Sequence, residues 1–206
     1  MNYVLRIKCC AEKSPLRQAP NRKPPLMKPL LFILTIAFII SCKTKQITLV
    51  QTNFSFSRPQ LGEIEWIENQ NSGIRIYKPF KISVAKNYFP NADKLTLGQP
   101  LLYLRDTASI RTQITYFFSE PDSLMRLVEY SWDNLHGKQN VIEPLYESNK
   151  KQISRMFRLT GNETIETHEA WSQKTIIWQN DSIHIKQFML IQGTPSRTRV
   201  LISWKK

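Results

Sequence analysis

The stretch Pro144–Gly161, which reads PLYESNKKQISRMFRLTG, decides the fold class of this chain. It begins with a proline, which the first turn of a helix tolerates, and ends with a glycine, which is favoured just past a helix C-terminus. The residues between them form an imperfect apolar stripe near helical spacing, opposite a basic face: Leu145, Asn149, Ile153, Met156, Phe157 and Leu159 against Lys150, Lys151, Arg155 and Arg158. The pattern predicts one main helix from Pro144 to Thr160. A basic amphipathic helix can lie on a membrane, but the tryptophan-rich extended segments on both sides of this one favour packing on a sheet.

The residues before this helix predict a hairpin. Ile110–Phe118 and Leu124–Trp132 are extended runs, and the loop-forming residues Ser119–Ser123 separate them. Two such runs joined by a short turn are typical of antiparallel strands that follow one another directly.

The residues after Gly161 predict three more strands, Lys174–Trp178, Ser182–Gln192 and Arg197–Lys205. Turns are expected at Gln179–Asp181 and Gln192–Ser196, where turn-forming residues gather. The second half of the middle strand is apolar on both faces, which predicts a central position in the sheet.

This order of two strands, a helix and three strands predicts an α+β fold. We expect an antiparallel sheet of five or more strands with one main helix packed on a face. An all-β sandwich or barrel is the alternative.

The segment before the hairpin is harder to assign. Leu61–Asn69 fits a half-exposed strand or a frayed helix turn, and Asn71–Gly73 fits a turn. Ile74–Val84 is strand-like on both sides of Pro79, which would place a bulge or a sheet edge there. Leu101–Leu104 predicts a short buried strand.

Three glutamates in this segment raise the question of an acidic site. In a strand, Glu63 and Glu65 would lie on one face and Glu68 on the other. We therefore expect no acidic site there.

An apolar run near the N-terminus, Leu30–Ile40, indicates where the chain resides. A membrane-spanning helix needs about 20 apolar residues, and a run of about 10 to 14 is more typical of a signal-peptide core. Lys28 precedes the run, and Ser41 and polar residues follow it. This is the layout of an export signal; the alternative is a buried or short membrane helix with Cys42 as a free thiol.

Ile39, Ile40, Ser41 and Cys42 resemble the lipobox of bacterial lipoproteins, with isoleucine where that family prefers leucine at the first position. The resemblance implies that diacylglycerol and acyl chains such as palmitate are attached at Cys42, and that Ser41 is the last residue removed. Two or more acyl chains hold a protein stably on a membrane. Lys43 stands where the family's sorting rules place an acidic residue for inner-membrane retention, so the resemblance implies the outer membrane, with the periplasm as the expected side.

The expected organisation follows from this signal. Residues 1–26 are a basic, proline-containing leader or a mis-assigned start, with Met27 as the alternative start, and residues 27–41 are the signal peptide. Residues 42–53 form a lipidated tether, and residues 54–206 form a single globular domain.

The charge balance bears on partners. The chain has 29 basic and 16 acidic residues, of which residues 1–42 hold seven and one, so the remainder stays cationic. The cations are scattered and lack the clustered pattern of nucleic-acid binding proteins, so no nucleic-acid partner is expected. A basic surface is compatible with anionic lipid, an envelope protein or an acidic envelope polymer.

No catalytic, cofactor-binding or metal-binding residue is predicted. No pair of histidines among His136, His168 and His184 has the spacing of a helical metal site. His184 alternates with isoleucines, and His168 lies between glutamates without an identified partner. The serines lack the Gly-x-Ser-x-Gly setting, and after Cys9, Cys10 and Cys42 no cysteine follows. The sequence therefore predicts a lipid-anchored envelope protein that binds or supports a partner, with Cys42 as its one functional residue and a lipid-anchored periplasmic hydrolase as the alternative.

Overall fold

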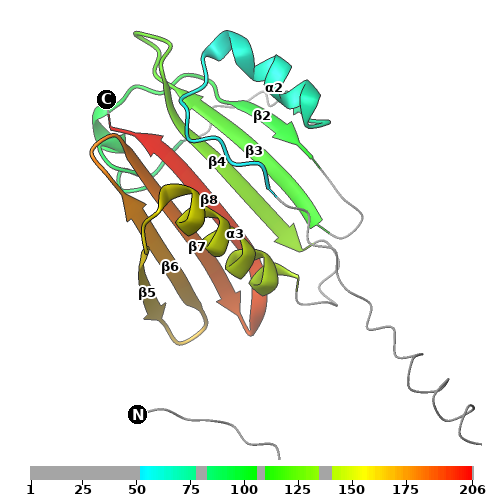
Figure 1. Cartoon of the computed structure of the whole chain (residues 1–206), viewed down its shortest axis with the longest axis vertical. Helices are drawn as coiled ribbons and strands as arrows, with labels where there is room; N and C mark the ends of the chain where they lie inside the picture. The colour runs from blue at the N-terminus through cyan, green and yellow to red at the C-terminus, as the bar shows by residue number, and fades with distance from the viewer. Residues whose placement is uncertain (1–51, 78–82, 106–109, 135–140, 206) are drawn as a thin grey trace, which may run out of the picture. The chain divides into compact units, whose positions relative to one another are not determined.

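A computed structural model describes residues 52–77, 83–105, 110–134 and 141–205 of the chain (Figure 1). All of these residues belong to one compact unit, Ile47–Lys206. The predictions made for residues 1–51, including the lipidation of Cys42, lie outside the described residues and stay predictions.

The described residues form one eight-stranded sheet in the order β1-β2-β3-β4-β8-β7-β6-β5. Every neighbouring pair is antiparallel, and the sheet is open, with β1 and β5 at its edges. The strands are β1 (Ile74–Ile76), β2 (Leu101–Leu104), β3 (Ile110–Phe118), β4 (Met125–Asn134), β5 (Asn162–Thr167), β6 (Ser172–Gln179), β7 (Ile183–Gln192) and β8 (Thr194–Trp204). The helices are the short 3-10 turns η1 (Leu61–Glu63) and η2 (Ala92–Lys94) and the α-helices α2 (Ile64–Gln70) and α3 (Ile142–Phe157).

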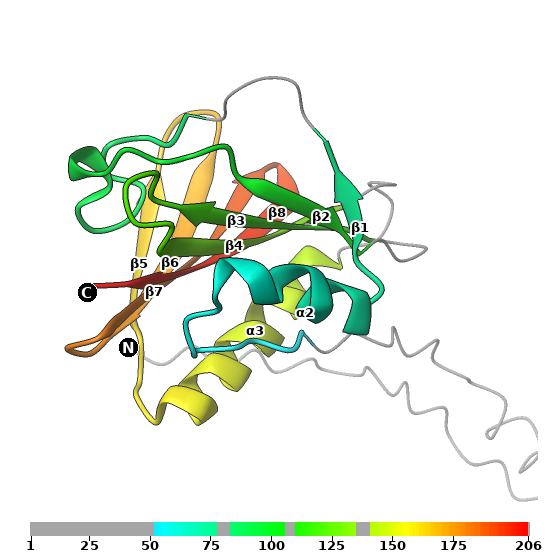
Figure 2. The same cartoon turned by 90° about the horizontal axis from the view of Figure 1, so that it is seen from above.

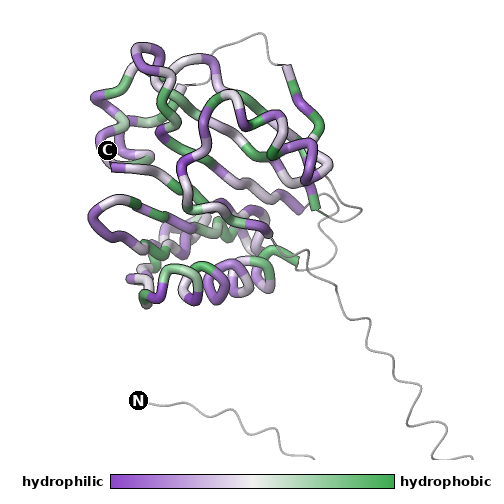
Figure 3. Tube along the Cα trace, turned by 45° about the horizontal axis from the view of Figure 1, so that its top comes forward, coloured by the Kyte–Doolittle hydropathy of each residue, from purple (hydrophilic) through white to green (hydrophobic). Residues whose placement is uncertain are grey.

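The α+β prediction is confirmed, because α3 packs on strands β4, β8, β7 and β6. Figure 2 shows α2 and α3 on the same side of the sheet. The apolar stripe of α3 buries Leu145, Tyr146 and Ile153 against Ile185, Val200 and other residues of the sheet. Along α3 the hydropathy alternates with the turns of the helix (Figure 3), which is what an amphipathic helix on a sheet requires.

The opposite face of the sheet carries a second, smaller core. Phe117, Leu127 and Leu201 pack there against Phe89 and Ala92, which belong to the connection between β1 and β2. A polar network fixes this connection: Tyr88 OH donates to Glu129 Oε2 at 2.9 Å, and Arg199 Nη1 donates to Tyr88 OH at 2.9 Å. The sheet is therefore covered on both faces over β3, β4 and β8.

An extended segment, Thr52–Arg58, crosses the helix side of the sheet, and we call it the strap. Phe54 is buried and meets the rings of Tyr130 and Trp132 edge-on, at centroid distances of 5.2 and 6.3 Å. Trp204 Nε1 donates to the Phe56 carbonyl at 3.1 Å. The strap thus contributes both apolar and hydrogen-bonded contacts to the main core.

The hairpin, the strand Leu101–Leu104 and the internal position of Ser182–Gln192 are confirmed. After Gly161, however, the chain forms four strands, because β5 precedes the three expected ones. All six residues of β5 are exposed, so this edge strand lacks the apolar alternation that predicts strands. The strand expected beyond Pro79 falls partly on residues 78–82, outside the described residues, and β1 itself is limited to Ile74–Ile76.

The main helix begins two residues earlier than expected and ends at Phe157. Arg158, with φ 54°, takes the left-handed position that we expected of a C-cap glycine. Gly161 has a different role, since a Cβ there would collide with the side chains of Ile176 and Trp178. The last hairpin is also tighter than expected: Gly193, with φ 70°, makes the turn, and Pro195 already lies in β8.

Candidate functional site

Leu61–Asn69 is helical, and this places a carboxylate inside the protein. The turn η1 begins with a reciprocal cap, in which the Gln60 N–H donates to Glu63 Oε2 at 2.9 Å. The helix α2 then buries Ile64 and Glu68, which are four residues apart and share one face. The strand interpretation is wrong here, and so is the face that it assigned to Glu68.

Glu68 is fully buried and accepts three hydrogen bonds from two side chains. Arg105 donates through Nε to Oε2 at 2.8 Å and through Nη2 to Oε1 at 2.6 Å. Tyr116 OH donates to Oε1 at 2.5 Å. The absence of a side chain at Gly73 makes room for this carboxylate, because a Cβ at that position would collide with it. The arrangement satisfies a buried charge, which is otherwise costly.

Burial and the Glu68 charge shift the pKa values of the groups around this carboxylate. Burial and the neighbouring Glu68 charge raise the pKa of the Tyr116 hydroxyl well above its usual range. Burial also raises the pKa of Tyr130 to about 12. Burial alone would lower the pKa of Arg105, but the hydrogen bonds and charge of Glu68 outweigh it and raise that pKa. The cluster thus has the properties of a structural ion pair.

A small polar cavity of about 50 Å³ adjoins this cluster, and we call it the inner cavity. It is lined by Asn53, Ser55, Pro59, Ile67, Asn71, Arg105, Tyr116, Val128 and Tyr130. A space of this size with several polar walls suits one or two water molecules rather than a ligand.

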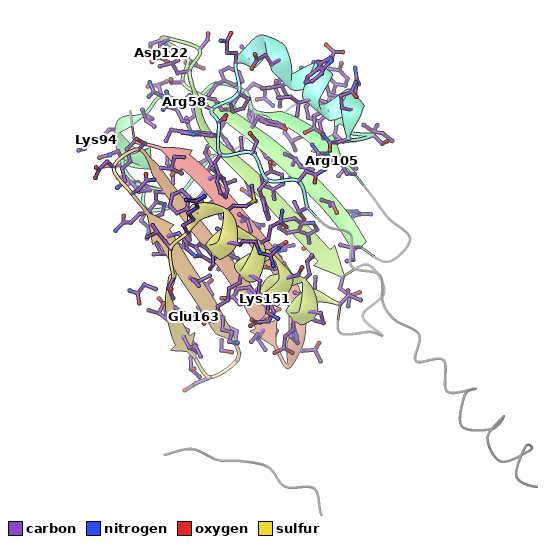
Figure 4. The ribbon with its side chains drawn as sticks, viewed as in Figure 1. Arg58, Lys94, Arg105, Asp122, Lys151 and Glu163 are labelled. Atoms are coloured by element: carbon purple, nitrogen blue, oxygen red, sulfur yellow. The ribbon has the colours of Figure 1, made fainter. Side chains whose placement is uncertain are left out.

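A larger depression of about 400 Å³ lies on the other side of Pro59, and we call it the outer pocket. Its lining residues come from the end of the strap, the turn η1 and the β3–β4 turn: Arg58, Pro59, Gln60, Leu61, Gly62, Ser123, Leu124 and Met125. Figure 4 shows Arg58 and Asp122 near each other at this end of the sheet, away from Lys151 and Glu163. The volume lies within the range of small-molecule sites.

Arg58 provides the charge of the outer pocket. Its guanidinium carbon lies 5.7 Å from the centre of the Trp204 ring, over its face. Burial lowers the pKa of Arg58, the nearby positive charge of Arg126 lowers it further, and Asp122 acts in the opposite direction. Among the described residues no ion pair to a carboxylate is formed by Arg58.

The carboxylate that acts on Arg58, Asp122, already has partners of its own. Asp122 accepts hydrogen bonds from the Ser119 hydroxyl, from the Leu124 N–H at 3.1 Å and from Arg126 Nη2 at 2.5 Å. The hydrogen bond from Ser119 is the largest cause of its lowered pKa. Asp122 therefore forms its ion pair with Arg126, and Arg58 at the pocket wall feels it only at a distance.

The two histidines in the described residues lie apart. The His168 ring stacks on Trp171 in the β5–β6 turn, with centroids 4.0 Å apart, whereas His184 pairs with Gln179 at the other end of β6. The eight residues of β6 separate them by roughly 23 Å at the usual rise of a strand. The third histidine, His136, lies outside the described residues.

Ser203 is opposite His184 in the β7–β8 register, but its hydroxyl donates to the His184 backbone carbonyl at 3.2 Å. Burial, followed by the charges of Lys205 and Lys186, lowers the pKa of His184 to about 4. The charged side chains that shift the pKa of His184 are both cations, whereas a catalytic triad requires a carboxylate that orients the imidazole.

In the described part of the chain, no three His, Cys, Asp or Glu side chains are placed to hold a metal ion. None of its helices has the length and apolar character needed to cross a bilayer. We found no protein-family model, no curated protein and no solved structure that matches the chain.

Sequence reasoning missed Arg58, Asp122 and Arg126 as members of one site. They come from the strap and from the hairpin that begins with β3, and no motif connects them. Asp122 was recognised only as a turn former. The one available signal was the Arg58–Pro59 pair before a helical turn, which by itself does not indicate a ligand.

Proposed function

We propose that this protein is a lipid-anchored binding module of the bacterial cell envelope, held on the outer membrane by acyl chains on Cys42. The observation that carries the proposal is the lipobox-like Ile39–Cys42 after an apolar run of signal-peptide length. The folded unit presents a charged pocket and binds its ligand or partner without chemical conversion.

The docking of the strap supports a membrane-proximal position for the domain. Gln152 of α3 donates through Nε2 to the Thr52 carbonyl at 2.6 Å, so the chain is fixed to the domain from Thr52 onward. Thr52 lies ten residues after Cys42, and a fully extended chain over ten such steps spans at most about 36 Å. A domain on such a tether operates within a few nanometres of the lipid surface.

Metabolic labelling with radioactive palmitate tests the anchor. The full chain, the Cys42→Ala variant and the Cys10→Ala variant are expressed in a bacterium that processes lipoproteins. We expect label on the wild type and on Cys10→Ala, and none on Cys42→Ala, because only Cys42 follows the apolar run. The reasoning fails if Cys42→Ala is labelled as strongly as the wild type.

A further inference from the structure

We propose that the outer pocket binds an oxyanion, either a carboxylate or a phosphate ester, carried on a small apolar body. This proposal deepens the binding role stated above and rests on it. It assigns Arg58 as the residue that recognises the charge and Leu124 as part of the surface that receives the apolar body.

The orientation of Arg58 is the first argument. A guanidinium that lies on an aromatic face uses its π surface for that contact and keeps its N–H groups in the plane of the group. The Arg58 guanidinium carbon lies over the Trp204 ring, 5.7 Å from its centre, and Arg58 also lines the pocket. Trp204 is itself fixed by its hydrogen bond to the Phe56 carbonyl. The pocket therefore has a guanidinium on its wall, and the donor pattern of a guanidinium suits two oxygens of one anion.

The local charge balance is the second argument. Arg126 is close enough to Arg58 to lower its pKa, and the carboxylate that opposes this effect, Asp122, is bound by Arg126, Ser119 and a backbone N–H. A cation that is partly removed from water gains most from a counter-charge of its own. An incoming anion supplies this charge without displacing an existing ion pair.

The apolar wall is the third argument. Pro59, Leu61, Leu124 and Met125 line the pocket beside Arg58. Leu124 is 40% exposed, which makes it one of the exposed large apolar side chains in the described residues. Inorganic phosphate alone would leave this wall in contact with water, whereas an alkyl or aromatic body would cover it and gain from its burial.

The test uses the full-length lipidated protein in a non-ionic detergent, labelled with ¹⁵N. Four probes are titrated at pH 7.5: hexanoate, hexyl phosphate, hexanol and inorganic phosphate. The readouts are the dissociation constant and the shift of the Trp204 indole N–H resonance, identified by its absence in Trp204→Phe. We expect both hexyl anions to bind and to shift this resonance, and we expect hexanol and inorganic phosphate to bind at least tenfold more weakly.

Variants separate the charge from the apolar wall. Arg58→Gln should weaken binding of both hexyl anions at least tenfold, whereas Arg155→Gln, which removes an exposed cation of α3, should leave it unchanged. Leu124→Ser should weaken the hexyl anions and leave inorganic phosphate unchanged, and it tests the pocket even if Arg58→Gln does not fold. Every variant contacts the same micelles, so partition of a given probe into detergent cancels when variants are compared.

The proposal is overturned if hexanol binds as tightly as hexanoate, if neither hexyl anion binds, or if Arg58→Gln binds like the wild type. Equal affinity for inorganic phosphate and hexyl phosphate would overturn the apolar part. A preference between the two hexyl anions identifies carboxylate or phosphate as the natural group. Failure of these titrations leaves the palmitate labelling of Cys42 untouched, so the two proposals fail separately.

Discussion

Among single changes in the cluster of Glu68, Arg105 and Tyr116, removal of the Glu68 carboxylate should lower the stability of the protein most. Glu68 has no exposed surface, and the side chain of Arg105 is 15% exposed. Glu68→Ala would leave the Arg105 guanidinium without its counter-charge and Tyr116 without its acceptor. Breaking a buried ion pair from one side typically costs about 3–5 kcal/mol. For a domain of this size, that loss corresponds to a fall in melting temperature of about 6–20 °C.

Urea unfolding, followed by tryptophan fluorescence, measures this loss as a change in the free energy of unfolding. Glu65→Ala is the matched control, because Glu65 is an exposed glutamate of the same helix, and it should change that free energy by less than about 0.5 kcal/mol. In a double-mutant cycle, Arg105→Met should recover much of the loss in the Glu68→Ala background. A Glu68→Ala variant that loses less than about 1 kcal/mol, or a cycle without coupling, would refute the role assigned to this pair.

Two further predictions concern stability. The pKa of His184 is lowered to about 4 in the folded protein, whereas that of an unfolded histidine is about 6.5. Between these two pH values unfolding therefore takes up a proton. The contribution of His184 to stability is complete above pH 6.5, and the free energy of unfolding should fall by roughly 1–3 kcal/mol towards pH 4. His184→Gln should abolish this part of the pH dependence in urea titrations, and an unchanged slope would contradict the assignment. Gly161→Ala should cost about 1–3 kcal/mol, because the added methyl group meets Ile176 and Trp178. Gly62→Ala is its control, since a Cβ at Gly62 meets nothing within 4 Å, and equal melting temperatures for the two variants would show that the close packing at Gly161 has no energetic consequence.

The sheet and its main helix were predictable from the sequence because their patterns are local. In β7, Ile183, Ile185 and Met189 recur at even spacing and lie on the face that packs against the main core. In α3 the spacing of Leu145 and Ile153 marks one buried stripe. Such periodicities follow from backbone geometry, so they can be read before any tertiary contact is known.

The edge strand β5 and the helix α2 were not predictable in the same way. The strand β5 exposes every side chain and is defined by its pairing with β6. The short helix α2 leaves Trp66 67% exposed and buries Glu68, which is the reverse of what their polarity indicates. In both cases the tertiary partner outweighs the local preference of the residues.

The candidate site depended on tertiary structure even more strongly. The sequence by itself led to the anchor proposal at Cys42 and predicted the α+β class and the strands β3, β4, β6, β7 and β8. Only the fold decided that Arg105, 37 residues away, neutralises Glu68, and that Asp122 binds Arg126 while Arg58 lies over the Trp204 ring. The physical reason is that charge pairing and pocket shape depend on distances across the fold, whereas hydrophobic periodicity depends only on the order of residues along the chain.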